Sequence, residues 1–260
     1  MTTDRRAFLK RSTALGFAFA ADEVLNAQAE SPTATSRYTL ANAKLRLQFD
    51  GRGLLSIEDV AVGKTFRFKR DRFKLEIDKK PIESAALRAV TVWADAGTLT
   101  CNFKTGLYNI QGVYKLRAGW RLVSKQILVS RVQEGSFTAD GVEPLQFDLE
   151  DPVSELCLQN SRYSMLRGSG AAGVSGIAEH DLGLEQTGAK AYVAFLRMQG
   201  MRGLFTLLQN PFFDCAQEGQ VFSLRYSPRM EWQTAWGPFP CDRARIGPYN
   251  WKRTRCTRLN

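Results

Sequence analysis

One histidine, His180, is present among 260 residues, and this scarcity excludes several classes of site. A metal site built from several histidines cannot form, and any Ser–His–Asp or Cys–His mechanism would have to use this one residue. No C-x-x-C pair occurs among the five cysteines, so neither a zinc ribbon nor a dithiol redox motif is indicated. No apolar run reaches the roughly 18 residues that a membrane-spanning helix needs. We therefore expect no metal, no cofactor and no stable membrane span.

The first 29 residues have the order of parts of a bacterial export signal. The basic head carries the export motif, which consists of Arg5, Arg6, Phe8, Leu9 and Lys10. A mildly apolar stretch covers Ser12 to Ala21, and Ala27 and Ala29 form an A-x-A cleavage site. Paired arginines followed by Phe-Leu-Lys predict the twin-arginine route, with its export machinery as a partner and a periplasmic or secreted protein as the product. Cleavage after Ala20 and an N-terminal helix of the folded domain are the alternatives.

The composition is that of a folded domain with an excess of positive charge. Hydrophobic residues make up 44% of the chain and charged residues 24%, which excludes disorder, collagen and coiled coil. The formal net charge is +10. Because the chain is expected to be exported, we expect no nucleic acid partner. Anionic polysaccharide, lipid headgroups or a surface that is merely kept soluble remain open as explanations of this charge.

Short segments in which apolar and polar residues alternate recur from residue 38 to residue 249. Leu45, Leu47 and Phe49 form one such segment, and the turn at Asp50–Gly53 follows it. No segment shows a sustained helical period, so the pattern predicts an all-β fold, a large antiparallel two-sheet β-sandwich. The expected strands are Leu45–Phe49, Leu54–Ile57, Phe73–Ile77, Val90–Trp93, Leu99–Phe103, Tyr108–Leu116, Trp120–Ser130, Phe137–Leu149, Glu155–Leu158, Tyr192–Leu196, Leu204–Leu208, Phe222–Tyr226 and Met230–Trp236.

Four segments follow from this pattern. They are the signal peptide 1–29, a flexible lead-in 30–37, the sandwich domain 38–249 and a basic tail 250–260. The five cysteines leave at least one without a partner in the chain, and an oxidising compartment permits a disulfide among the others. We expect Cys101 to be a buried strand residue, and Cys215–Cys241 is the most plausible pair.

Candidate acid–base groups are few. His180 lies between Glu179 and Asp181, where it is either an exposed loop residue or a general acid or base. The nearby glycine-rich segment Gly168–Gly176 lacks the Lys-Ser/Thr of a P-loop, so we interpret it as a surface loop. Carboxylates gather at Asp140, Glu143, Asp148, Glu150 and Asp151. They are either solvated loop acids or the source of the two facing carboxyl groups that glycoside hydrolysis needs.

Aromatic residues are concentrated near the C-terminal end of the sandwich. Trp232 and Trp236 are four residues apart, so they would share a face of a strand, and the turn signal at Gly237–Pro238 places Trp236 near a strand end. Aromatic rings pack on the C–H faces of sugars, while charged groups bond the hydroxyls. Trp232, Trp236, Asp242 and Arg245 are therefore candidate carbohydrate-binding residues; burial of the rings in the core is the alternative.

The order of several loose motifs resembles a known family. The motifs are Leu40-x-Asn42, Leu45-x-Leu47-x-Phe49-Asp50-x-x-Gly53-Leu54-Leu55-Ser56-Ile57-Glu58-Asp59, Trp120-x-Leu122-x-Ser124-Lys125, Phe137-x-x-Asp140-x-Val142-Glu143 and Asp242-x-Ala244-x-Ile246-Gly247-Pro248-Tyr249. Together they resemble the N-terminal β-supersandwich domain of α-galactosidase-type glycoside hydrolases, which is similar in fold to galactose mutarotase. In those enzymes a (β/α)₈ barrel after the sandwich holds both catalytic aspartates, and these have no counterpart here. Mutarotases of this fold use more than one histidine, whereas this chain has only His180, so the resemblance gives little support to mutarotase activity.

The resemblance implies a sugar-related ancestry without the catalytic residues. We therefore expect an exported carbohydrate-binding or accessory sandwich that is non-catalytic by itself. One alternative is a carbohydrate-active enzyme, a glycosidase, epimerase or lyase, that uses carboxylates of the sandwich. The other is a truncated structural fragment, which would self-associate or need a partner domain to cover an apolar face.

Overall fold

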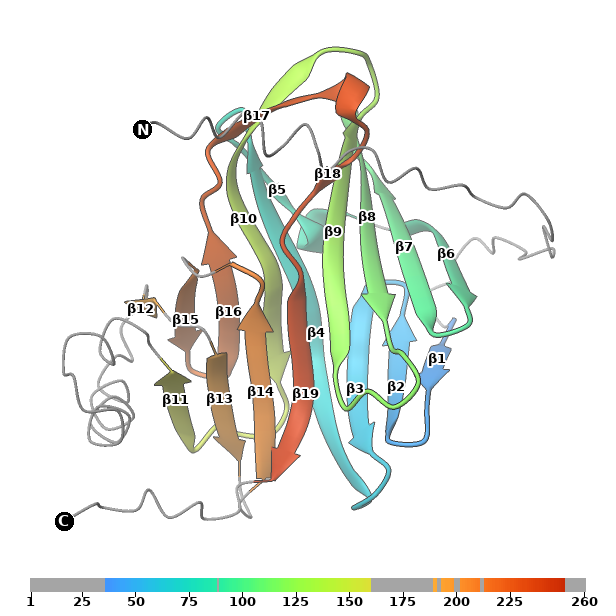
Figure 1. Ribbon diagram of the computed structural model, residues 1–260, viewed down its shortest axis with the longest axis vertical. Coiled ribbons are helices and arrows are strands. Elements are labelled where there is room, and N and C mark those ends of the chain that lie inside the picture. Colours follow the sequence, from blue (N-terminus) through green and yellow to red (C-terminus); the bar gives the residue numbers. More distant parts are fainter. Residues whose placement is uncertain are drawn as a thin grey trace, which may run out of the picture.

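The computed structural model describes residues 36–87, 89–159, 189–190, 193–198, 202–210 and 213–250. Within them, two antiparallel sheets pack face to face (Figure 1). The 10-stranded sheet has the order β1 (Tyr38–Ala41), β2 (Leu45–Asp50), β3 (Gly53–Asp59), β4 (Lys64–Ile77), β10 (Ser136–Leu149), β16 (Val221–Tyr226), β15 (Asp214–Glu218) and β12 (Ala189–Lys190), with β5 (Lys80–Glu83) on β4 and β17 (Met230–Gln233) on β10. The predicted all-β sandwich is confirmed.

The 9-stranded sheet forms the second layer. Its order is β11 (Glu155–Gln159), β13 (Val193–Met198), β14 (Arg202–Leu208), β19 (Ala244–Asn250), β9 (Val123–Arg131), β8 (Tyr108–Lys115), β7 (Thr98–Lys104) and β6 (Ala89–Asp95), with β18 (Phe239–Pro240) on β9. Two single-turn 3₁₀ helices, η1 (Ser84–Ala86) and η2 (Thr234–Trp236), join strands at the rim. No helix in the part of the chain that the structure describes is long and apolar enough to cross a membrane.

Alternating side chains build the core between the sheets. On β2, Leu45, Leu47 and Phe49 are fully buried, while the residues between them face solvent, as a strand with one buried face requires. Ring pairs cross from one sheet to the other. Phe49 meets Tyr114 of β8 at 5.0 Å between ring centroids, and Phe73 of β4 meets Phe103 of β7 at 5.4 Å. The period-2 pattern therefore identified the core face correctly.

A break in this alternation on β4 shapes the candidate site described below. Phe66 and Phe68 are buried, Lys69 and Arg70 are both exposed, and burial resumes at Asp71. An extra residue in a strand changes which face the following side chains occupy, as in a β-bulge. Pairing between β3 and β4 ends where Ser56 meets Arg67. The two strands therefore diverge at the bulge, and the carboxylate of Asp71 turns into the core.

Most of the predicted strands differ from the observed ones by one or two residues at an end, and three differ by more. Phe73–Ile77 is only the second part of β4, which begins at Lys64. The segment Met230–Trp236 is a strand only to Gln233, and Thr234–Trp236 form η2. The reason is the turn at Gly237, whose φ is 83° and whose N–H donates to the carbonyl oxygen of Thr234 at 3.0 Å. In addition, β9 begins at Val123 rather than at Trp120. Short strands without apolar alternation, such as β15, were not predicted.

The expected disulfide between Cys215 and Cys241 is wrong. Both residues are buried, and Cys241 belongs to no disulfide in the part of the chain that the structure describes. Cys215 lies on β15 of the first sheet, while Cys241 donates its N–H to Ile127 of β9 in the second. The expectation that Cys101 is a buried strand residue is confirmed.

Several predicted features lie outside the described residues. These are the signal peptide 1–29, most of the lead-in 30–37, the glycine-rich segment Gly168–Gly176, His180 and the tail from residue 251 onward. The segment boundaries and the export motif therefore stay predictions.

Candidate functional site

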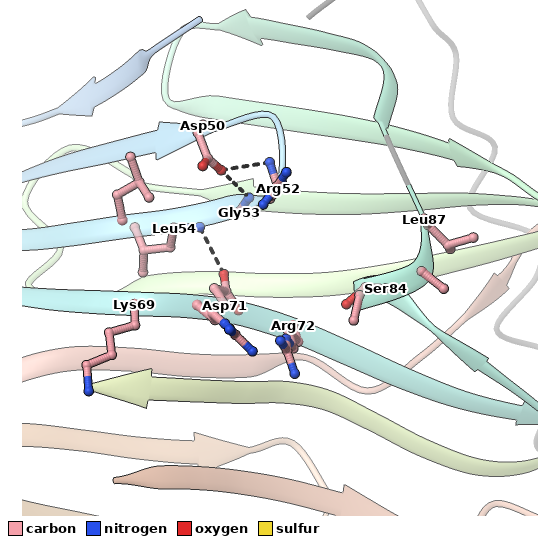
Figure 2. Close-up of a pocket in the computed structure, with 13 residues that line it drawn as sticks. Asp50, Arg52, Gly53, Leu54, Lys69, Asp71, Arg72, Ser84 and Leu87 are labelled. Atoms are coloured by element: carbon pink, nitrogen blue, oxygen red, sulfur yellow. Dashed lines mark hydrogen bonds between the residues drawn. The ribbon is translucent and has the colours of Figure 1, made fainter. Parts of the chain in front are cut away.

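A pocket of about 430 Å³ opens where β3 and β4 diverge (Figure 2). Three parts of the chain surround it: the β2–β3 turn, the bulge of β4 and the short helix η1. The lining residues are Asp50, Arg52, Gly53, Leu54, Leu55, Lys69, Arg70, Asp71, Arg72, Ser84, Ala85, Ala86 and Leu87. A volume of this size falls within the roughly 300–1,000 Å³ of small-molecule sites. The divergence of the two strands is thus what creates the hollow.

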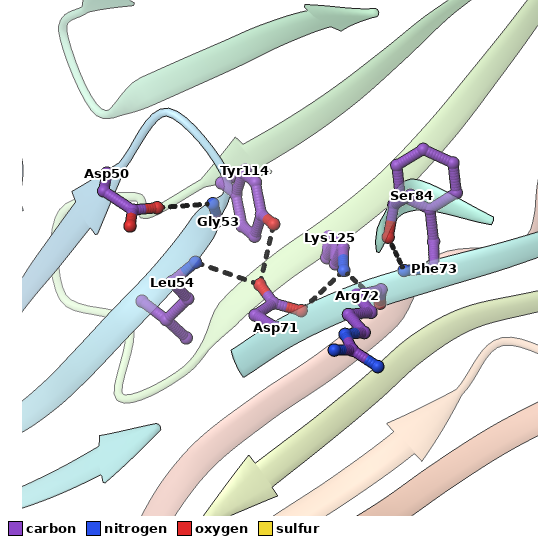
Figure 3. A network of polar contacts seen from close by, with 9 residues as sticks. All are labelled: Asp50, Gly53, Leu54, Asp71, Arg72, Phe73, Ser84, Tyr114 and Lys125. Carbon is purple, nitrogen blue, oxygen red and sulfur yellow. Dashed lines mark hydrogen bonds and ion pairs between the residues drawn. The ribbon is translucent and has the colours of Figure 1, made fainter. Parts of the chain in front are cut away.

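Asp71, which lines the pocket, forms a buried ion pair with Lys125 (Figure 3). Lys125 Nζ lies 2.6 Å from Asp71 Oδ1 and also donates to the carbonyl oxygen of Arg72 at 2.8 Å. Asp71 Oδ2 accepts from the Tyr114 hydroxyl at 2.7 Å and from the backbone N–H of Leu54 at 3.1 Å. Burying two charges is unfavourable unless both are paired and hydrogen-bonded, and here they are. Asp71 therefore holds the two diverging strands together.

Groups around this pair are held in their protonated forms. Burial, and then the negative charge of Asp71, raises the pKa of Tyr114 well above its ordinary value. Burial first, and Asp71 second, raises the pKa of Cys101 to about 12. A thiol reacts as a thiolate, so Cys101 is not a nucleophile near neutral pH. The buried network around Asp71 is therefore structural rather than reactive.

The β2–β3 turn approaches β4 closely because of Asp50 and Gly53. Asp50 Oδ1 accepts from the backbone N–H groups of Arg52 at 2.7 Å and of Gly53 at 3.0 Å, which closes an Asx-type turn. Gly53 has a φ of 150°, and a Cβ there would lie 3.0 Å from the carbonyl oxygen of Asp71. Only glycine combines this φ with this approach. The sequence motif around Gly53 predicts a turn, but nothing in it indicates the contact with Asp71.

The predicted aromatic site lies at another place in the fold. Figure 1 shows η2, which carries Trp236, at the end of the sandwich where β9 connects to β10. Trp236 is 62% exposed, whereas Trp232 on β17 packs partly against the core. The two rings meet edge to face at 5.3 Å, and Trp232 meets Phe239 at 5.3 Å on its other side. Trp232 therefore supports Trp236 from the core side.

Hydrogen bonds fix this end of the sandwich. Trp232 Nε1 donates to the carbonyl oxygen of Gly237 at 2.9 Å. Two hydrogen bonds join Thr234 and Gly135. The Thr234 N–H donates to the Gly135 carbonyl oxygen, and the Gly135 N–H donates to Thr234 Oγ1, each at 3.0 Å. Helix η2 is thereby attached to the β9–β10 connection. The exposed ring of Trp236 therefore belongs to a turn whose backbone is fixed by hydrogen bonds.

The structure does not bring Asp242 and Arg245 beside these tryptophans. Phe239 pairs with Val129 on β9, whereas Arg245 pairs with Ser124, five residues away. At about 3.3 Å per residue, this separates them by roughly 17 Å. The guanidinium of Arg245 lies 6.0 Å from the ring of Trp120.

Asp242 forms hydrogen bonds with residues other than the two tryptophans. Its Oδ2 accepts from Asn210 Nδ2 at 2.8 Å, and its backbone N–H donates to the hydroxyl of Tyr226 at 2.7 Å. The four predicted residues thus form no single cluster, because β18 and β19 place them at different levels of β9.

The predicted carboxylate cluster is spread along β10 and beyond its end. Burial raises the pKa of Glu143, against the opposing charges of Lys74 and Arg225. Among the residues that the structure describes, none bonds to Glu143 Oε1. Asp148 lies five residues farther along the same strand, or roughly 17 Å. Glycosidases need two carboxyl groups about 5–9.5 Å apart. Asp140 accepts from the backbone N–H of Lys79 at 2.8 Å. This arrangement does not favour hydrolysis by the β10 carboxylates.

Solved structures with the same architecture come from carbohydrate enzymes and related proteins. An alpha-mannosidase from Enterococcus faecalis V583 matches with a TM-score of 0.52 and 9% identity over 87% of this chain and 30% of that chain. A galactose mutarotase-like protein from Lactobacillus casei ATCC 334 matches at 0.47 and 11% over 82% and 100%. The galactosidase domain of an alpha-galactosidase-sucrose kinase matches at 0.49 and 10% over 82% and 40%.

These likenesses concern the fold. The chain spans about a third of the length of the alpha-mannosidase that it matches. No protein-family model and no curated protein matches the sequence. The resemblance to a mutarotase-like sandwich of glycoside hydrolases is confirmed as a resemblance in fold.

Proposed function

We propose that this protein is an exported, non-catalytic sandwich that binds carbohydrate with Trp236 as its stacking surface. The observation that carries the proposal is the 62% exposure of this ring on a turn held by hydrogen bonds. Indole rings combine a large apolar face with a donor at the edge, which suits the C–H face and the hydroxyls of a sugar. Support also comes from the fold, which is similar to that of an alpha-mannosidase.

The surroundings of Trp236 favour a preformed binding surface. Trp232 meets its ring edge to face, and rigid aromatic side chains lose little conformational entropy on binding. Trp236 itself is not part of the core, so its removal leaves the core packing intact.

The test is the Trp236→Ala variant with a glycan array and calorimetry on galacto- and manno-oligosaccharides. Partial burial of the ring against a sugar contributes roughly 1–2 kcal/mol, so we expect about tenfold weaker binding. We expect the melting temperature to change little. Val60→Ala is the matched control, because Val60 is 41% exposed in the β3–β4 connection. Equal affinity of wild type and Trp236→Ala would contradict the proposal.

The non-catalytic part of the proposal has its own assay. The described carboxylates of β10 are either too far apart or bonded to backbone, so we expect no turnover of aryl-α-galactosides by the pure protein. Sustained hydrolysis that survives purification would contradict it and would direct attention to Glu143, whose pKa is raised by burial.

A further inference from the structure

The pocket between β3 and β4 is lined by more positive charge than its acidic residues neutralise. Arg52, Arg70 and Arg72 all line it. None of these three guanidinium groups forms an ion pair with any residue that the structure describes. Lys69 also lines it, but its Nζ donates to Gln220 Oε1 at 2.9 Å and lies 3.9 Å from Asp148 Oδ1.

Both acidic residues of the pocket are already occupied. Asp50 accepts the two backbone N–H groups of the β2–β3 turn. Asp71 is 2% exposed in its side chain and is neutralised by Lys125, with Tyr114 on its other oxygen. Asp50 keeps its negative charge, whereas Lys125 offsets the charge of Asp71. Four cationic side chains line the hollow, namely those of Arg52, Lys69, Arg70 and Arg72, so its walls carry a net positive charge.

We propose that this pocket binds an oxyanion, namely the acidic group of a saccharide or a free phosphate. Guanidinium groups present a planar fork of donors that matches the geometry of a carboxylate, sulfate or phosphate. Ser84 adds a hydroxyl to the wall: its Oγ accepts from the N–H of Phe73 at 2.9 Å, which leaves its own hydrogen for an acceptor in the pocket. The volume of about 430 Å³ admits a ligand larger than a bare ion.

The architecture explains why the charge gathers here. The bulge exposes Arg70, and the strand divergence leaves Arg72 beside the turn that carries Arg52. The ion pair beneath holds the walls in place, so the cations are arranged before a ligand arrives. This site is separate from Trp236, because β17 pairs with the Phe137 end of β10, whereas the bulge faces its Asp148 end. The inference therefore stands apart from the proposed function.

Calorimetry of the full chain at constant ionic strength tests the inference with three probes: trigalacturonate, inorganic phosphate and neutral galactotriose. We expect saturable binding of at least one anion. Loss of charge-assisted hydrogen bonds should weaken it about tenfold or more in an Arg52→Gln/Arg72→Gln variant. Lys104→Gln is the control, because Lys104 is exposed on β7 of the other sheet. Arg70→Gln is the second variant, should the double variant fail to fold.

The outcomes divide clearly. Tighter binding of trigalacturonate than of phosphate identifies an acidic saccharide as the ligand, and the reverse identifies free phosphate; both support the pocket. Absence of saturation with either anion overturns the inference. Equal anion affinity in wild type and in the arginine variants, or equal weakening by Lys104→Gln, also overturns it. Trp236→Ala should leave anion binding unchanged, so failure of the sugar platform and failure of the pocket are separate results.

Discussion

Gly53 lies so close to Asp71 that a Cβ on residue 53 would come within 3.0 Å of the Asp71 carbonyl oxygen and 3.1 Å of its Cβ. This approach lets the next residue, Leu54, donate its N–H to Asp71 Oδ2 across the gap between the diverging strands. One side chain thus satisfies a backbone donor that the sheet leaves unpaired. The contact links the β2–β3 turn, the bulge of β4 and the buried lysine.

Gly53→Ala should destabilise the fold by about 1–3 kcal/mol, because it adds a clash with backbone to a φ of 150° that L residues rarely adopt. Chemical denaturation measures the loss. Gly63→Ala is the matched control, since Gly63 has a φ of 64° but nothing within 4 Å of its ideal Cβ. Gly63→Ala therefore also places alanine at a positive φ, but its Cβ meets no neighbouring atom. Equal losses for both variants would contradict the close contact.

Lys125→Met should destabilise by about 3–5 kcal/mol, because it leaves the carboxylate of Asp71 buried without its partner. The double variant Asp71→Leu/Lys125→Met removes both charges and should recover most of this loss, as replacement of buried pairs by apolar residues often does. Urea denaturation of wild type, Lys125→Met, Asp71→Leu and the double variant measures the coupling. Additive losses in the double variant would show that the two side chains do not depend on each other.

Glu143→Gln should stabilise the protein at pH 7 and have little effect at low pH. Burial raises the folded-state pKa of Glu143 above its unfolded value, so folding favours the protonated carboxyl. Its contribution is favourable below the unfolded pKa, about 4.3, and is lost as the pH rises through the folded pKa. Melting curves of wild type and variant from pH 3 to pH 8 test this. A difference in melting temperature between wild type and variant that grows toward acid pH would contradict this prediction.

Replacing Arg5 and Arg6 by lysine should leave precursor in the cytoplasm if the twin-arginine route exports the chain. Cell fractionation measures this, and Lys10→Arg is a control that keeps the positive charge of the head. We expect the mature protein to begin after Ala29. Normal periplasmic accumulation of the double variant, or an N-terminus before residue 20, would overturn this export prediction.

Residue patterns alone predicted much of the fold because the alternation of apolar side chains is a local property. Leu45, Leu47 and Phe49 have the same spacing in the sequence as in the buried face of β2. The sequence also indicates that a turn follows Trp236, since Gly237–Pro238 is a local turn signal. The strand β15 was not predicted, because its residues Asp-Cys-Ala-Gln-Glu show no such alternation.

The candidate sites were harder, because they depend on residues that are distant in the sequence. Asp71 follows Lys69 and Arg70 in a charged run, where no local pattern indicates burial, and its partner Lys125 lies 54 residues away. Trp232 and Trp236 meet because they are close in sequence, but Arg245 is carried away from them along β9. Proximity across strands follows from register, and register is decided by the whole sheet.

The sequence by itself determined an all-β sandwich, because a period of two residues buries one face of each strand whatever the partner strand is. Only the tertiary structure decided that β3 and β4 separate at a bulge, that Asp71 and Lys125 meet inside the core, and that three arginines surround the resulting hollow. The physical reason is that buried charges and strand divergence are settled by contacts between distant segments, where each group must find its partner in three dimensions.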